Sequence, residues 1–507
     1  MKNRVLKIAS RAAPVLIALV MLILIVAYFM LRASLPILSG DIALSKLGSS
    51  VTVTRDANGT AAITANNTTD AMRALGFIHA QERFFEMDLT RRAAAGELSA
   101  LLGSATVEYD KKKRQHRFRD RMNKAWLILP TEQKNIISAY ADGVNSGITN
   151  LSATPWQYTL LRAAPQPWTE VDSLLVICEM FYMLQAKSFE DAFVNASLRE
   201  KMGDTLFAWM KPLGGTWDAA MDGSVIAPVA MPTAEQIDVR LKKTPPTISK
   251  NDDVFDFSPL STNATSATSA ENSVGSNAWA VDGSLTKTGA GMLANDMHLG
   301  LSVPNIWFRA EFLITDELGK PGSKKIVGVT LPGVPALVAG SNGHIAWGFT
   351  NSYGKWFDWV PVPKDEHVTI QRETIEVKSG IAVALDIRET RFGPILETQN
   401  DQQYALNWLA HRPGAINTNI MQMMFAKNVD EAIVIAQQSG APHQNLLVVD
   451  TEGKLAWTIA GRLPKRVPKQ APQNPQRAGW AKATELSDER LPIADYPVIK
   501  KDRKSVV

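Results

Sequence analysis

The sequence predicts an α+β protein in which helices dominate the first half and strands the second. Before about residue 210, apolar residues recur at the spacing of amphipathic helices. After about residue 275, short apolar runs bounded by turn residues are typical of buried strands. The stretch between them, with Pro-Pro and STNATSATSAENSV, has the composition of a linker. The chain therefore divides into an N-terminal stub with an apolar segment (1–35), a helix-rich region (36–240), a linker (241–275) and a strand-rich region (276–507).

Composition excludes several classes of protein. The 507 residues include 54 Lys+Arg and 50 Asp+Glu, and a net charge of +4 gives no reason to expect a nucleic-acid partner. The single cysteine, Cys178, excludes an internal disulfide, a CxxC redox pair and a multi-cysteine zinc site. The GxSxG, GxGxxG, GxxxxGK and HExxH motifs are missing from the sequence. An α/β-hydrolase, a P-loop enzyme and a zincin are therefore poor interpretations.

The N-terminus predicts a membrane anchor. Residues 12–31 carry no charge and are almost wholly apolar, and a helix of this length spans about 30 Å, the thickness of the hydrocarbon core. Cations precede the run, so the positive-inside rule places the N-terminus in the cytoplasm and the rest on the periplasmic side of the inner membrane. The alternative is a cleaved signal peptide and secretion to the periplasm. Its apolar core is usually shorter, and no small-x-small site follows Leu31.

The first half of the chain predicts two strands followed by several helices. Two short strands are expected around an Asp-Ala-Asn-Gly turn, and a long helix is expected to end near a glycine. The basic run 111–117 is interpreted as a solvated helix face, and Cys178 as an inert core residue within an apolar helix. The expected strands are 51–53 and 61–63, and the expected helices are 70–101, 133–148, 171–184 and 189–202.

The second half predicts buried strands, separated by turns that contain Gly, Pro, Asn or Asp. No internal repeat is evident. The expected strands are 277–281, 291–294, 307–313, 325–331, 336–339, 344–349, 368–377 and 446–449.

The chemistry is expected where the linker meets the first of these strands. Cleavage between Gly275 and Ser276 would make Ser276 a new N-terminal residue, with its hydroxyl as nucleophile and its own α-amine as base. An α-amine has a pKa of about 7.7–8.0 in model compounds. Taken alone, the Gly-Ser pair could equally be an ordinary turn from loop to strand.

The surrounding motifs resemble the penicillin acylase family of N-terminal-nucleophile hydrolases. They occur in the family's order: RDANGTAAI, ALGFIHAQERFFEMDLTRRAAAGELSALLG, GSNAWAV, ANDMHL, LPGVPALVAGSNGHIAWGFTN and PHQNLLVVDTEGKLAWTIAGRLPKR. The resemblance covers residues 38–490. It implies the four-layer αββα sandwich of that class and autoproteolytic maturation into a heterodimer of α and β chains. The implied activity is hydrolysis of a small N-acyl amide: a penicillin or cephalosporin side chain, an N-acyl homoserine lactone or a similar compound.

The resemblance also implies roles for individual residues. Ser276 matches the catalytic N-terminal serine, and Asn445 the side-chain donor to the oxyanion. Asn351 matches the residue whose backbone N–H is the second donor, and Arg466 an arginine that tunes the serine amine. His298 stands where cephalosporin and acyl-homoserine-lactone acylases have a histidine, and it is expected to bond the nucleophile, the alternative being a structural histidine.

Substrate contacts are expected from two places. Tyr182 and Met183 lie on the predicted helix 171–184, which is either a pocket wall or plain core. Tyr353 and Phe357 follow the segment that carries the second oxyanion donor.

The residues predict no cofactor for catalysis. Some family members hold a structural calcium through aspartates beside the oxyanion segment. In this chain Asp358 is the one aspartate of that stretch, and Lys355 places a cation where a ligand would be. The sequence therefore argues against calcium.

The chain is also shorter than the resemblance implies, because family β chains continue well past the final KKDRKSVV. This leads to the expectation of a C-terminally truncated β chain. The alternative to an active amidohydrolase is then a membrane-tethered remnant of the family without activity.

Overall fold

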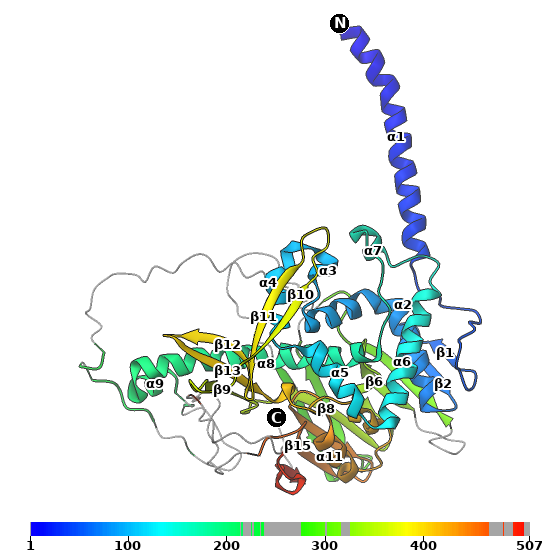
Figure 1. The fold of residues 1–507 in the computed structure, drawn as a ribbon. Coiled ribbons are helices and arrows are strands. Elements are labelled where there is room, and N and C mark those ends of the chain that lie inside the picture. The colour runs from blue at the N-terminus through cyan, green and yellow to red at the C-terminus, as the bar shows by residue number, and fades with distance from the viewer. Residues whose placement is uncertain are drawn as a thin grey trace.

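The structure is a computed structural model, and its helices and strands confirm the α+β content (Figure 1). Residues 241–274 of the predicted linker (241–275) and Arg466 lie outside the described residues. The described residues are 2–212, 214–215, 225, 228–233, 235–237, 275–299, 302–315, 325–465, 480 and 490–500, with side chains described from residue 13 onward.

Within these residues the largest unit is a sheet of nine strands in the order β1-β2-β5-β6-β7-β8-β14-β15-β16. Neighbours are antiparallel except β2 and β5, which are parallel. The predicted strands of this sheet are all found, and β15 and β16 were not predicted. Its strands are β1 (Thr52–Arg55), β2 (Ala61–Ala65), β5 (Phe308–Ile314), β6 (Ile326–Thr330), β7 (Leu337–Ser341), β8 (Ile345–Asn351), β14 (Gln444–Asp450), β15 (Leu455–Ala460) and β16 (Val498–Lys500).

Helices cover one face of this sheet, and the side chains between them form the main core. The other face of β14 packs against a separate hairpin of β3 (Ser276–Val281) and β4 (Met292–Met297), through Ala278, Ala280 and Leu447. The four-layer αββα arrangement stays a prediction. The helices are α1 (Lys2–Ala33), α2 (Thr68–Ala95), α3 (Ser99–Leu102), α4 (Val107–Arg114), α5 (Phe118–Ile128), α6 (Thr131–Thr149), α7 (Trp156–Leu161), α8 (Glu170–Met202), α9 (Asp204–Met210) and α11 (Val429–Gln438).

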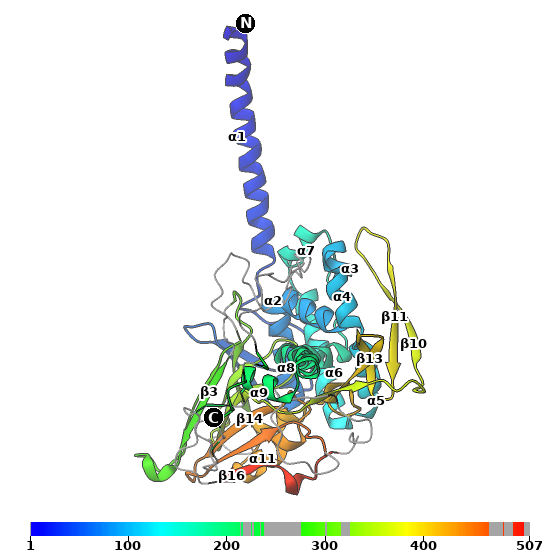
Figure 2. The ribbon, with the colours of Figure 1, turned by 90° about the vertical axis from the view of Figure 1, so that its left-hand side faces the viewer.

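Two helix boundaries differ from the prediction. The helix expected over 70–101 ends at Ala95, because Gly96 adopts a left-handed conformation with φ 66° and caps it, and α3 follows separately. The helices expected over 171–184 and 189–202 are one helix, α8, since no Gly or Pro separates them. At the expected break, Gln185 is buried because its amide oxygen accepts a hydrogen bond from Trp408 Nε1 at 2.7 Å. Figure 2 looks nearly along α8, which runs through the middle of the body.

The interpretation of 111–117 as a solvated face is wrong for its centre. Lys113 is 1% exposed, and its Nζ lies 2.8 and 2.7 Å from the two carboxylate oxygens of Glu179 on α8. The ammonium also lies 3.3 Å from the ring centroid of Tyr182. Burial of Lys113 is compatible with its charge because a carboxylate and an aromatic face replace the lost water.

A second sheet has the order β10-β11-β12-β13-β9 within the described residues. Its first strand was predicted as buried, but most of its side chains are exposed or half-buried, because β10 and β11 form a hairpin that extends from the body (Figure 1). The strands are β9 (Phe357–Pro361), β10 (Thr369–Ile375), β11 (Val383–Thr390), β12 (Gly393–Gln399) and β13 (Gln402–Trp408).

Helix α1 extends away from the body, with no other element beside it (Figures 1 and 2). Its apolar stretch, Ala13–Ala33, is long enough to cross a membrane and is not buried against the protein. The foot of the helix is attached to the body, since the backbone N–H of Ala153 donates to the carbonyl of Ala33 at 3.1 Å.

Candidate active site

Ser276 is the first residue of β3 and lies at the open end of the β3–β4 hairpin. In register it faces Met297 on β4. The carbonyl of Gly275, in the peptide bond predicted to be cut, accepts a hydrogen bond from the backbone N–H of His298 at 3.0 Å. The predicted cleavage site is therefore held at the end of a regular strand pair rather than in a free loop.

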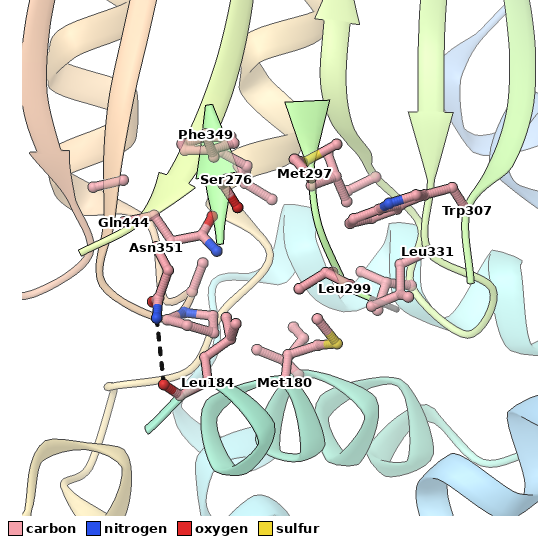
Figure 3. A pocket seen from close by; sticks show the side chains of 18 of the residues that line it. Met180, Leu184, Ser276, Met297, Leu299, Trp307, Leu331, Phe349, Asn351 and Gln444 are labelled. Atoms are coloured by element: carbon pink, nitrogen blue, oxygen red, sulfur yellow. Dashed lines mark hydrogen bonds between the residues drawn. The ribbon is translucent and has the colours of Figure 1, made fainter. Parts of the chain in front are cut away.

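The half-buried Ser276 lines a pocket between the hairpin, the ends of β8 and β14, and α8 (Figure 3). Met180 and Leu184 reach up from α8, and Ser276 lies on the opposite side. The cavity volume is about 90 Å³. Its lining comprises Ile177, Met180, Leu184, Ser276, Met297, Leu299, Trp307, Leu331, Val334, Ala336, Val338, Phe349, Asn351, Asn417, Ile420, Ala441, Pro442, Gln444 and Ala460.

This lining is almost entirely apolar, and among its described residues no side chain is charged. The polar groups gather on one side, where Asn351 and Gln444 are cross-strand partners on β8 and β14 and Gln444 points toward Ser276 (Figure 3). Asn351 Nδ2 lies 3.5 Å from the carbonyl of Leu184, which connects the end of β8 to α8. The pocket can therefore hold an uncharged, apolar group beside the Ser276 hydroxyl.

Asn445 lies on the opposite face of β14 from Gln444, because successive strand residues alternate. Its Nδ2 donates to Thr350 Oγ1 at 3.1 Å and to the carbonyl of Asn351 at 3.2 Å. Its Oδ1 accepts from Trp457 Nε1 at 3.2 Å. The structure thus brings the two residues predicted as oxyanion donors together at the end of the β8–β14 pair.

The backbone of His298 bonds Gly275 across the strand pair, next to the nucleophile, but the His298 ring makes another contact. Its Nε2 lies 2.7 Å from the Asp296 carboxylate, and both side chains are well exposed. The ring is not among the groups that line the pocket. A hydrogen bond from His298 to Ser276 stays a prediction.

The predicted substrate contacts are divided between two places. Tyr182 covers the Lys113 ammonium, and Met183 packs against the core. Tyr353 and Phe357 line a second cavity of about 530 Å³, which meets the first at Leu184. Helix α8 does form a wall of the first pocket, but it does so with Ile177, Met180 and Leu184.

Asp358 does not fit a calcium site. The residue is 5% exposed, and its Oδ1 lies 3.1 Å from Lys355 Nζ. Across the described ranges, no three carboxylate, imidazole or thiol groups come close enough to hold a metal ion. Calcium needs several oxygen ligands, so we derive no step through a metal.

Most residues of the pocket lining were not predicted from the sequence, although the spacing of some of them indicates a shared face. Ile177, Met180 and Leu184 are spaced by three and four residues and therefore share one face of α8. Gln444 is adjacent to Asn445, which was predicted as an oxyanion donor. Because the side chains of a strand alternate, Gln444 lies on the opposite face of β14 from Asn445. Trp307 and Leu331 were predicted as strand ends but lie just outside β5 and β6, and nothing in their local sequence indicates a pocket.

Comparison with known proteins gives consistent relatives. The family model for penicillin amidase matches residues 50–507. Penicillin acylase 2 proenzyme of Pseudomonas sp. (strain SE83) is 27% identical over 466 residues, which cover 89% of this chain and 56% of that protein. The acyl-homoserine lactone acylase QuiP of Pseudomonas aeruginosa is 25% identical, with 85% and 52% covered. The chain thus spans about half the length of these curated relatives.

Among solved structures, a thermostable penicillin G acylase from Alcaligenes faecalis has 17% identity and a TM-score of 0.35, covering 46% of this chain and 43% of that one. The similarity in sequence is more extensive. The family model covers most of the chain, and the matched residues include both the Gly275–Ser276 junction and Asn445. The chain therefore belongs to the penicillin amidase family.

Proposed function

We propose that this chain is an autoprocessing amidohydrolase that forms an acyl-enzyme on Ser276. The observation that carries the proposal is the position of Ser276 on an apolar pocket that also contains Asn351, with Asn445 hydrogen-bonded to Asn351. A nucleophile, a site for an apolar acyl group and a pair of oxyanion donors are what amide cleavage through an acyl-enzyme requires.

The first chemical step is maturation. Cleavage of the Gly275–Ser276 peptide bond releases the α-amine of Ser276, and the chain becomes a heterodimer of α and β parts. The proposal is supported by the regular strand pairing around the junction. It is also supported by the relative named as a proenzyme.

In the mature enzyme, the α-amine of Ser276 takes the proton from its own Oγ as Oγ attacks the amide carbonyl. Negative charge moves to the carbonyl oxygen, where Asn445 Nδ2 and the backbone N–H of Asn351 donate. Each such donor lowers the barrier by about 2.7–4 kcal/mol. The tetrahedral intermediate then collapses, and the leaving amine receives the proton from the α-ammonium. Water hydrolyses the ester on Ser276 with the same amine as base.

The substrate class follows from the lining of the pocket. An uncharged apolar acyl group fits between Met180, Leu184 and Trp307, and the leaving amine then faces the cavity lined by Tyr353 and Phe357. Penicillin or cephalosporin side-chain amides and N-acyl homoserine lactones meet this requirement. The names of the relatives, penicillin acylase and acyl-homoserine lactone acylase, point to the same two classes.

The proposed location is the periplasmic side of the inner membrane. Helix α1 would span the bilayer, and cations at its N-terminus favour a cytoplasmic start. Removal as a signal peptide is the alternative. Alkaline carbonate extraction of membranes that contain the full chain separates the two, because an anchored chain stays in the membrane pellet and a secreted one is released.

A direct test uses a chromogenic N-acyl anilide with the full chain and its Ser276→Ala variant. We expect amine release by the parent chain and none by the variant. A covalent adduct with the mass of the acyl group should appear on the fragment that begins at Ser276. Equal hydrolysis by the variant would refute the proposal.

A further inference from the structure

We propose that Asn295 is a positioning residue that fixes the nucleophilic Ser276 relative to β8, the strand that carries Asn351, one of the two proposed oxyanion donors. The inference rests on the proposed function and adds to it a residue that does not contact the substrate. Asn295 lies on β4, and Ser276 lies on the partner strand β3. The relevant contacts join this hairpin to β8 of the main sheet.

The side-chain amide of Asn295 makes three hydrogen bonds to backbone groups. Its Nδ2 donates to the carbonyl of Asn277 at 3.0 Å and to the carbonyl of Phe349 at 2.9 Å. Its Oδ1 accepts from the backbone N–H of Phe349 at 3.1 Å. Both amide protons and the oxygen are therefore used, and the orientation of the amide is defined by its partners.

The bonds to Phe349 compensate for a gap in the main sheet. Strand β7 pairs with β8 only at Ala346 and Trp347, so beyond Trp347 it no longer covers that edge of β8. Phe349 would then have an N–H and a carbonyl without a strand partner, and buried backbone groups are almost always paired. The Asn295 amide satisfies both groups, as a neighbouring strand would.

The main sheet leaves room for this side chain. A Cβ on Gly348 would lie 2.6 Å from Asn295 Oδ1 and 2.7 Å from Asn295 Cβ, which is closer than real atoms approach. Gly348 is therefore required here for close approach, and Asn295 inserts into the notch that it leaves.

The consequence for the site is a short connected path. Asn277 directly follows Ser276, and Phe349 is two residues before Asn351, whose carbonyl accepts from Asn445. One amide thus joins the strand of the nucleophile to β8, whose last residue, Asn351, is hydrogen-bonded to Asn445. A displacement of about 1 Å between reacting groups can lower a rate about 10²-fold. Loss of the Asn295 amide should act on the reaction rate for this reason.

The test compares Asn295→Ala with Asn342→Ala. Asn342 is a matched control because its side-chain amide also links two backbone segments, donating to the carbonyls of Met423 and Ala426 and accepting from the N–H groups of His344 and of Ile345, the first residue of β8. It lies beside the other end of β8, and these four hydrogen bonds all go to residues outside the hairpin. Both variants should lose thermal stability. Only Asn295→Ala should lower kcat on the anilide substrate, by about 10–10²-fold with little change in KM, and slow cleavage before Ser276.

Two further variants give measurements that would not change if the role of Asn295 were purely structural. Asn295→Asp places a carboxylate beside the carbonyls of Asn277 and Phe349, so it should be as slow as the alanine variant at neutral pH. Because a falling pH also protonates the Ser276 α-amine in every chain, the readout is the ratio of its kcat to the parental kcat at the same pH, and this ratio should rise as the pH falls and the carboxyl regains a donor proton. Gly348→Ala should slow the enzyme in the parent chain. It should have little added effect in an Asn295→Gly background, which removes the atoms that it would strike.

The outcomes separate this inference from the proposed function. If the parent chain hydrolyses the anilide through Ser276 and Asn295→Ala keeps the parental kcat, the positioning role is refuted and the proposed function stands. Equal losses of kcat in Asn295→Ala and Asn342→Ala would refute it too, since general destabilisation would explain both. If the parent chain neither cleaves at Ser276 nor hydrolyses the anilide, the proposed function fails and this inference fails with it.

Discussion

Asn445 Nδ2 lies 3.2 Å from the backbone carbonyl oxygen of Asn351, and this hydrogen bond joins the two proposed oxyanion donors before any substrate binds. The amide is held from its other side as well, because Trp457 Nε1 donates to Asn445 Oδ1. With the oxygen occupied by an N–H donor, the NH₂ group must face Thr350 and Asn351. Both N–H groups of this amide therefore have acceptors already, so the oxyanion of a substrate would replace Thr350 Oγ1 or the Asn351 carbonyl as the partner of one of them.

The first prediction concerns this donor. Asn445→Ala should lower kcat by about 10²–10³-fold with little change in KM, because the hydrogen bond strengthens mainly in the transition state. Trp457→Phe keeps an aromatic side chain but removes the N–H that orients Asn445, so a smaller loss of kcat is expected. Steady-state kinetics on a soluble anilide measures both. A loss expressed through KM alone would assign Asn445 to substrate binding instead.

The second prediction concerns the acyl pocket. Met180→Trp should fill the space between α8 and Ser276 and lower kcat/KM for bulky acyl groups at least about tenfold more than for acetyl. Tyr182→Phe is the control on the same helix, and it retains the ring over Lys113. Rates over a series of acyl lengths measure the selectivity. A shift in selectivity for Tyr182→Phe and none for Met180→Trp would place the acyl group elsewhere.

The third prediction concerns the loss of stability at acidic pH. Burial lowers the pKa of His79 from 6.5 to about 3 and that of His443 to about 4. Between pH 6.5 and about 4 the unfolded chain therefore binds protons that the folded chain does not, so stability falls as the pH falls. Each histidine should reduce the free energy of unfolding by about 2 kcal/mol between pH 7 and pH 5.

Thermal unfolding of two variants at the two pH values tests this linkage. His79→Gln can still bond Tyr140 and Thr330, and it should lose its share of the pH dependence. His367→Gln alters an exposed histidine and should keep the parental dependence. Parental pH dependence in His79→Gln would show that His79 is not the titrating group.

The fourth prediction concerns the buried ion pair. Lys113→Met leaves the Glu179 carboxylate without its partner in the core and should lower the free energy of unfolding by about 3–5 kcal/mol. Lys112→Met is the control, since the adjacent Lys112–Glu190 pair is largely exposed and should contribute at most about 1 kcal/mol. Adding Glu179→Gln to Lys113→Met should restore part of the loss. A similar loss in the two lysine variants would contradict the distinction.

Local patterns in the sequence were enough to predict much of the fold. The strands of the main sheet that adjoin the site, β8 and β14, were predicted to within a few residues, because their apolar runs are bounded by turn residues. The buried state of Cys178 also follows from its apolar helix and is confirmed. Family membership depended on motifs with fixed order, and the family model confirms it.

Other features depend on contacts between distant segments, which local patterns do not encode. Lys113 is buried because Glu179 and Tyr182 on α8 pack against it, and a run of basic residues gives no sign of them. The role of Asn295 depends on where β7 leaves β8. The pocket combines α8 with loops around Trp307 and Leu331, so its lining appears only once the chain is folded.

The central claim is that Ser276 becomes an N-terminal nucleophile, and N-terminal sequencing of the purified full chain tests it most directly. We expect two polypeptides, of which the C-terminal one begins Ser-Asn-Ala-Trp, and a single uncut chain for Ser276→Ala. Any other N-terminus on that fragment, or one uncut chain in material that hydrolyses the anilide, would contradict the account.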